Sequence, residues 1–81
     1  MRLEITNDLE TYTIASDVTA QEASAIVKGY DEAYAKNPDI WWAVFEAWDF
    51  YLYDAQGQVY YMEVMDDDIH WFNLETLEEL A

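Results

Sequence analysis

Three consecutive aspartates, Asp66, Asp67 and Asp68, end two residues before His70, the one histidine of this 81-residue chain. In an extended segment Asp66, Asp68 and His70 alternate, so their side chains would lie on one side of the strand. Oxygen and imidazole ligands suit several divalent ions. The spacing is not specific for a metal, however, and the same residues also fit an exposed part of a larger negative surface. We favour the second interpretation and predict no metal ion and no cofactor.

Residues that could support covalent catalysis are few. The chain has no cysteine, its only serines are Ser16 and Ser24, and a triad would require His70 to meet one of them across the fold. With two glycines, Gly29 and Gly57, it has no phosphate-binding loop. Eighteen acids make a pair of carboxylates at any spacing inevitable, but the sequence indicates no cleft for glycoside hydrolysis. We therefore predict that the protein is not an enzyme.

The charge balance is the most unusual property of the sequence. Eighteen Asp and Glu stand against three Lys and Arg, for a net charge of -15, and residues 41 to 81 hold ten of the acids and no Lys or Arg. A net charge of roughly 2 to 8 already keeps a small domain soluble, and further charge destabilises the compact state by self-repulsion. Nucleic acids and anionic membranes would repel this chain. The expected partner is a basic protein.

The same sequence lacks targeting signals. No apolar run approaches the ~18 residues of a membrane span, and the first ten residues have neither the basic start nor the apolar core of a signal peptide. We expect a cytoplasmic protein.

Hydrophobic residues make up 53% of the chain and aromatic residues 17%, which is typical of a folded domain and not of a disordered acidic tail. The length predicts one domain spanning residues 1–81. We predict an α+β fold, in which two hairpins form an antiparallel sheet, one or two helices pack on one face and a short helix ends the chain.

Residues 2–15 predict the first hairpin. If residues 7–10 form the loop, Leu3 faces Ile14, Ile5 faces Tyr12, and Glu4 shares the other side with Thr13. The following "TAQE" is a capping box formed by Thr19 and Glu22. It predicts a helix whose inward positions are Ala23, Ile26, Val27, Tyr30 and Tyr34.

"NPDIWWAVFEAW" begins like a helix, with Asn37 as cap and Pro38 in the first turn. A short helix over residues 38–46 is preferred, and a strand is the alternative, because the run is too short for its periodicity to decide.

Residues 48–65 predict the second hairpin, with residues 55–57 as its loop and Gly57 left-handed. Asp54 then faces Gln58, and one face carries the pairs Leu52–Tyr60, Phe50–Met62 and Trp48–Val64. The other face carries Tyr53–Val59, Tyr51–Tyr61 and Asp49–Glu63.

After an extended segment through Trp71 and Phe72, the last residues predict a helix that Asn73 caps and that turns Leu74, Leu77 and Leu80 inward.

Like charges opposite each other on a sheet are destabilising, so the fold gains nothing from pairing Asp49 with Glu63. Acids at every second strand residue are about 6.6 Å apart. This spacing is of the same order as the phosphate repeat of about 3.4 Å per nucleic-acid strand. A folded chain can therefore place carboxylates roughly where a duplex places phosphates.

Small size, absence of cysteine, strong acidity and many aromatic residues together resemble the nucleic-acid-mimic inhibitors of phages and mobile elements, the anti-restriction and anti-CRISPR proteins. The resemblance covers composition over the whole chain and no motif. It implies a cytoplasmic DNA mimic that occupies the basic groove of a host defence complex. The alternative is an acidic partner, such as an antitoxin or adaptor, that neutralises a basic protein without imitating nucleic acid.

The predicted contact surface consists of carboxylates with tyrosines as rigid anchors. Its members are Asp49, Asp54, Glu63, Asp66, Asp67, Asp68, Tyr51, Tyr53 and Tyr61.

Overall fold

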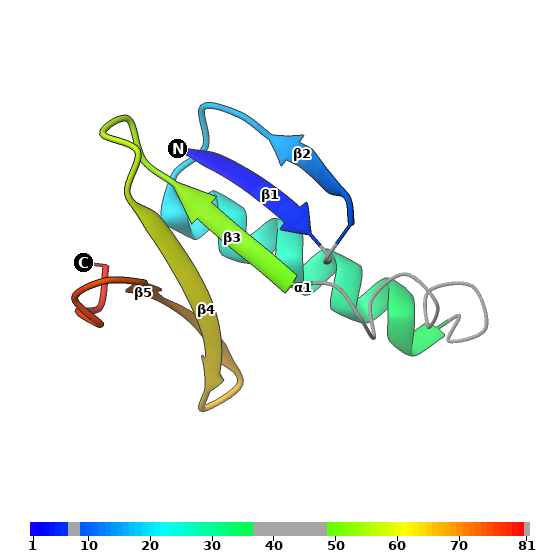
Figure 1. The fold of residues 1–81 in the computed structure, drawn as a ribbon. Coiled ribbons are helices and arrows are strands. Elements are labelled where there is room, and N and C mark those ends of the chain that lie inside the picture. Colours follow the sequence, from blue (N-terminus) through cyan, green and yellow to red (C-terminus); the bar gives the residue numbers. More distant parts are fainter. Residues whose placement is uncertain (7–8, 37–48, 81) are drawn as a thin grey trace.

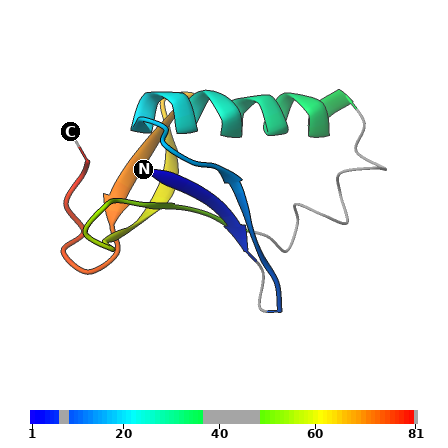
Figure 2. The ribbon, with the colours of Figure 1, turned by 90° about the horizontal axis from the view of Figure 1, so that it is seen from above.

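A computed structural model describes residues 1–6, 9–36 and 49–80 (Figure 1). In these residues the elements follow one another as β1 (Arg2–Thr6), β2 (Thr11–Ala15), α1 (Ala20–Lys36), β3 (Asp49–Tyr53), β4 (Val59–Met65) and β5 (Asp68–Asn73). The strands form one antiparallel sheet in the order β2-β1-β3-β4-β5. The helix α1 lies over one face of the sheet (Figure 2). The predicted α+β class and antiparallel sheet are confirmed.

The register of β1 and β2 follows from their alternating side chains, except at one point. Glu4 pairs with Thr13 and Ile5 with Tyr12, as predicted. Leu3 pairs with Ala15 and not with the predicted Ile14, because the register shifts between Leu3 and Glu4. Such an irregularity adds one residue to one strand and displaces every pair beyond it.

The capping box that begins α1 is confirmed. The Thr19 N–H donates to Glu22 Oε1 at 3.1 Å, and the Glu22 N–H donates to Thr19 Oγ1 at 3.1 Å. One turn later Ala23 and Val27 are buried. The predicted inward face of the helix therefore contacts the sheet at Ala23, Ile26 and Val27, whereas the side chain of Tyr34 is not among those that the structure describes.

The core lies between α1 and the sheet. It consists of the buried residues Leu3, Ala23, Val27, Leu52, Tyr60 and Trp71. Leu3 and Leu52 are paired across β1 and β3 and are both fully buried. Truncating either to alanine would cost about 2–5 kcal/mol, because the cavity adds to the lost transfer free energy.

The turn between β3 and β4 has the predicted register near its tip. Leu52 pairs with Tyr60, Tyr51 with Tyr61, and Tyr53 with Val59. The Asp54 N–H donates to the Gln58 carbonyl at 3.1 Å, and Gly57 has a φ of 82°. That left-handed conformation favours glycine, which has no Cβ.

Further from the turn, the predicted pairs of β3 and β4 are not formed. Asp49 pairs with Thr6 of β1, and Glu63 pairs with His70 of β5. The β1–β3 ladder extends over the whole of β3 and the β4–β5 ladder over most of β4, while the β3–β4 ladder covers three pairs. An interior strand can pair on both sides, but β3 and β4 diverge away from their turn, and their ladder ends at Tyr51 and Tyr61 (Figure 1). The predicted Asp49–Glu63 pair is therefore wrong.

The predicted C-terminal helix is also wrong. Asn73 does accept hydrogen bonds from the N–H groups of Glu75 and Thr76, at 2.9 and 3.0 Å, as a cap would. Leu77, however, has a φ of 63°, and this left-handed conformation stops the chain from continuing as a helix beyond its first turn. The chain then returns along β5, where the Leu80 N–H donates to the Trp71 carbonyl at 2.8 Å. Residues 78–80 thus lie beside β5, with one bridge between Phe72 and Glu79, and β5 makes the sheet larger than two hairpins.

Two remaining expectations concern other parts of the chain. The predicted helix at 38–46, and Trp48 with it, lie outside the described residues. Within the described part, no helix has the length and apolar character needed to cross a membrane.

Candidate functional site

The turn between β4 and β5 exposes two of the predicted aspartates. Asp66 and Asp67 form a two-residue loop between the paired residues Met65 and Asp68. Their φ angles are 53° and 62°. Positive φ at both positions is the pattern of a type I′ turn, which Asn-Gly or Asp-Gly forms with the least strain. This turn therefore keeps a second carboxylate where glycine would suit the backbone better.

Asp68, the next residue, is held by a cation from the helix. Lys28 Nζ donates to Asp68 Oδ1 at 2.7 Å. This hydrogen bond lowers the pKa of Asp68, and the charge of Lys28 acts in the same direction. Asp68 is thus an exposed carboxylate that also connects β5 to α1.

His70 has a partner that the sequence did not predict. Its Nδ1 lies 2.7 Å from Glu79 Oε2, and this hydrogen bond raises the pKa of His70. In the described residues, no group of three or more His, Cys, Asp or Glu side chains could hold a metal ion. The contact depends on the return of the chain along β5, which no local pattern in the sequence announces.

Residues 59–80 form an acidic unit, which consists of β4, β5 and the segment that follows them. It carries no Lys or Arg. Its seven acids are all exposed, namely Glu63, Asp66, Asp67, Asp68, Glu75, Glu78 and Glu79. The unit occupies one side of the molecule, coloured yellow to red in Figure 1. The charge asymmetry of the sequence is therefore an asymmetry in space.

Asp54 lies apart from the aspartates of the β4–β5 turn. It belongs to the turn at the other end of β4 (Figure 1). Its carboxylate accepts from the N–H groups of Gln56 and Gln58, both at 2.9 Å, and from the Tyr60 hydroxyl at 3.1 Å. Burial raises the pKa of Tyr60, and the bond to Asp54 raises it further. Asp54 thus shapes its own turn.

The three predicted tyrosines lie on the sheet face turned away from α1, which we call the open face. Side chains alternate along a strand. Because Leu52 and Tyr60 belong to the core under α1, Tyr51, Tyr53 and Tyr61 point the other way. Cross-strand pairing places Glu4, Tyr51, Tyr61 and Phe72 in one row, and Arg2, Tyr53 and Val59 in the next. The three tyrosines are half-buried.

Contacts on the open face fix several of these side chains. The Arg2 guanidinium lies over the Tyr53 ring, 4.7 Å from its centroid, and Arg2 Nε donates to the buried Glu4 carboxylate. The rings of Tyr61 and Phe72 stack with their centroids 5.8 Å apart. Alternation alone places Arg2 and Glu4 on one side of β1, but only the position of β1 beside β3 brings them to the tyrosines.

Asp49 begins β3 and is exposed, and it lies on the open face with Tyr51 and Tyr53. Glu63 likewise shares this face with Tyr61 on β4. The two carboxylates pair with outer neighbours and not with each other. The structure thus brings Asp49, Glu63 and the tyrosines to one face, with Asp66 and Asp67 beyond its β4 end.

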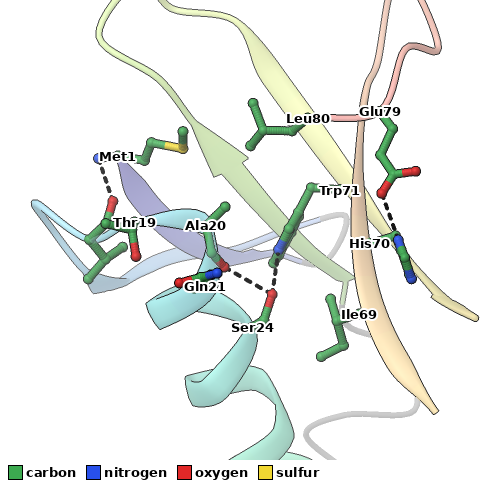
Figure 3. A pocket seen from close by; sticks show the side chains of 11 residues that line it. Met1, Thr19, Ala20, Gln21, Ser24, Ile69, His70, Trp71, Glu79 and Leu80 are labelled. Carbon is green, nitrogen blue, oxygen red and sulfur yellow. Dashed lines mark hydrogen bonds and ion pairs between the residues drawn. The ribbon is translucent and has the colours of Figure 1, made fainter.

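A pocket of about 580 Å³ lies between the first turn of α1 and β5 (Figure 3). In its wall the Trp71 indole N–H donates to Ser24 Oγ at 2.9 Å, and the Ser24 hydroxyl donates to the Ala20 carbonyl at 2.9 Å. His70 in the same wall is bonded to Glu79. These polar groups bond to one another, and the Trp71–Ser24 bond joins the helix to the sheet.

Comparisons with protein-family models, with curated proteins and with solved structures found no match. The resemblance to nucleic-acid mimics therefore stays a prediction from composition.

Proposed function

We propose that this protein is a DNA mimic that binds the basic nucleic-acid-binding surface of a host defence protein, such as a restriction or CRISPR complex, and blocks it without catalysis. The observation that carries this proposal is the acidic unit, in which seven exposed carboxylates occur with no Lys or Arg. A basic groove that attracts phosphates would attract these carboxylates by the same long-range field.

The spacing of the carboxylates supports the proposal. Glu63 lies two residues before the strand end, and Asp66, Asp67 and Asp68 follow at consecutive positions through the turn. Carboxylates on one side of a strand are about 6.6 Å apart, and this spacing is of the same order as the phosphate repeat of about 3.4 Å along one nucleic-acid strand. A series of cationic side chains arranged for phosphates could therefore meet a carboxylate at several successive positions.

The backbone of the β4–β5 turn gives further support. Left-handed backbone costs a residue with a side chain roughly 1–2 kcal/mol, although aspartate tolerates it better than most. The chain accepts this conformation at both Asp66 and Asp67. Mutual repulsion of the two carboxylates adds to the cost. Their role in binding would explain why the turn is not Asn-Gly.

A charge-matched pair of variants tests the proposal. We expect the triple variant Glu63→Gln, Asp66→Asn, Asp67→Asn to bind its basic target about ten-fold more weakly, since three lost contacts of roughly 0.5 kcal/mol each amount to about a factor of ten. Asparagine tolerates the left-handed turn, so the fold should remain. The control Glu10→Gln, Asp17→Asn, Glu32→Gln removes the same charge from exposed positions outside the acidic unit and should bind nearly normally.

The target would be captured from host lysate, identified and purified, and its affinity measured by biolayer interferometry. Affinity should fall as NaCl rises, and duplex DNA should compete. Equal weakening by both triple variants would show that net charge alone acts. Binding that persists in excess duplex DNA would exclude mimicry and leave the acidic, non-mimic partner as the explanation.

A further inference from the structure

The chain's own Arg2 shows how the open face holds a guanidinium. Its side chain lies over the ring of Tyr53, which is in the same cross-strand row. It also bonds to the carboxylate of Glu4, which is in the next row along β1. The two contacts are compatible because a guanidinium is planar. One flat side can cover an aromatic ring while its edge donates to a carboxylate.

A ring with a carboxylate one row away occurs twice more on the open face, here with both residues on the same strand. Tyr51 is followed on its side of β3 by Asp49, and Tyr61 on its side of β4 by Glu63. Asp49 and Glu63 are exposed and make no ion pair with any described residue. Both combinations therefore lack the cation that Arg2 supplies beside Tyr53.

The described cations of the chain are used elsewhere. Arg2 pairs with Glu4, and Lys28 pairs with Asp68. His70 lies across the ladder from Glu63 but bonds to Glu79. No cationic side chain that the structure describes therefore lies over Tyr51 or Tyr61, and a partner could supply one at each ring.

We propose that the open face binds two neighbouring arginine side chains of a partner protein, one over Tyr51 with Asp49 and the other over Tyr61 with Glu63. This inference rests on the proposed function and names the chemistry of the partner surface. Tyr51 and Tyr61 are directly opposite on adjacent strands whose backbones lie about 5 Å apart, so the two arginines would come from neighbouring positions on the partner surface. Phe72 stacks on Tyr61 and fixes that ring before binding.

Arginine is favoured over lysine for a physical reason. An ammonium group is a strongly hydrated point charge, whereas a guanidinium is more weakly hydrated and can stack and donate at once. A site made only of carboxylates would not distinguish the two. A site that includes the tyrosine rings would prefer arginine.

The test compares octa-arginine and octa-lysine peptides, which carry equal charge, by isothermal titration calorimetry on the full chain. We expect octa-arginine to bind about five-fold more tightly at the same salt concentration. The double variant Tyr51→Leu, Tyr61→Leu should lose this preference, and Tyr51→Phe, Tyr61→Phe should keep it, because phenylalanine retains the ring face. Tyr12→Leu changes an exposed tyrosine on β2, outside the open face, and should have no effect.

A second measurement does not depend on the variants being folded. In NMR spectra of the unmodified protein, octa-arginine should shift the ring resonances of Tyr51 and Tyr61 more than octa-lysine does. Equal affinities for the two peptides, or a preference that survives in the leucine variant, would overturn the inference. If both peptides bind with equal affinity, and the triple variant at Glu63, Asp66 and Asp67 binds both more weakly while its control does not, the arginine site fails and the proposed function stands. If octa-arginine is preferred but duplex DNA does not compete with this protein for its target, the arginine site stands and the DNA-mimic function fails.

Discussion

At the scale of single residues, the acids of this chain divide into two groups. Some take part in the fold: Glu22 caps α1, Asp54 shapes a turn, and Glu4 holds Arg2 on the sheet. Others, such as Glu63, Asp66 and Asp67, are exposed, and their side chains form no hydrogen bond or ion pair with the described residues. The second group is the one that a binding function must explain.

The His70–Glu79 pair predicts a pH dependence of stability. The hydrogen bond that His70 donates to the Glu79 carboxylate raises the pKa of His70 above its ordinary 6.5. The pair therefore stabilises the folded state fully below about pH 6.5 and loses this effect as pH rises through the folded pKa. Glu79→Gln should lower the melting temperature relative to the unmodified protein near pH 6, and this loss should shrink toward about pH 9.

Glu75→Gln is the matched control, because it removes the same charge from an exposed residue without a histidine contact. Its effect on the melting temperature should change little over this pH range. Parallel pH curves for the two variants would show that the His70–Glu79 bond does not contribute to stability in solution.

At the scale of the elements, local rules account for where α1 begins and where β3 turns into β4. The two glycines lie in contrasting backbone conformations. Gly29 lies within α1, where a Cβ would meet nothing within 4 Å and the backbone is helical. Gly57 lies in a turn with a φ of 82°. One position tolerates a side chain and the other does not.

We predict that Gly29→Ala raises the free energy of unfolding by about 1 kcal/mol, because alanine loses less backbone entropy in a helix. Gly57→Ala should lower it by about 1–2 kcal/mol, because alanine is strained in the left-handed region. Urea denaturation of both variants would measure these changes. A loss of stability in Gly29→Ala would indicate that this helix face has a contact partner.

At the scale of the whole molecule, the net charge of -15 opposes folding. The acidic unit gathers seven of the negative charges in 22 consecutive residues. In the described structure its acids pair with two cationic groups, Lys28 of α1 and the unit's own His70. Added salt should therefore raise the stability of the fold and lower the affinity of the complex.

We expect the melting temperature to rise as NaCl increases from about 0.05 M to about 0.5 M, because the Debye length falls from more than 10 Å to only a few Å and self-repulsion weakens. Over the same range the affinity for a basic target should fall, since the attraction is screened as well. Thermal denaturation and titration in the same buffers would test both. A melting temperature that falls with salt would show that attractive ion pairs dominate the fold.

Much of the local structure could be predicted because it depends on neighbours in the sequence. Thr19 and Glu22 are three residues apart, so their reciprocal bonds need only one helical turn. Tyr51 and Tyr61 are paired by a short turn whose Gly57 sets the register. The acidity of residues 59–80 is likewise a property of the sequence itself.

Tertiary structure decided the rest, because the deciding contacts join residues distant in sequence. The pairing of β1 with β3 places Thr6 beside Asp49 and Arg2 over Tyr53, and no local pattern could show that these strands are neighbours. The return of residues 78–80 along β5 overrode the helical pattern near Leu77 and brought Glu79 to His70. The sequence by itself determined how much negative charge this protein carries and on which segment. Only the packing of the strands decided which of those charges lie beside the tyrosines, because a shared sheet face is made by pairing across strands and not along them.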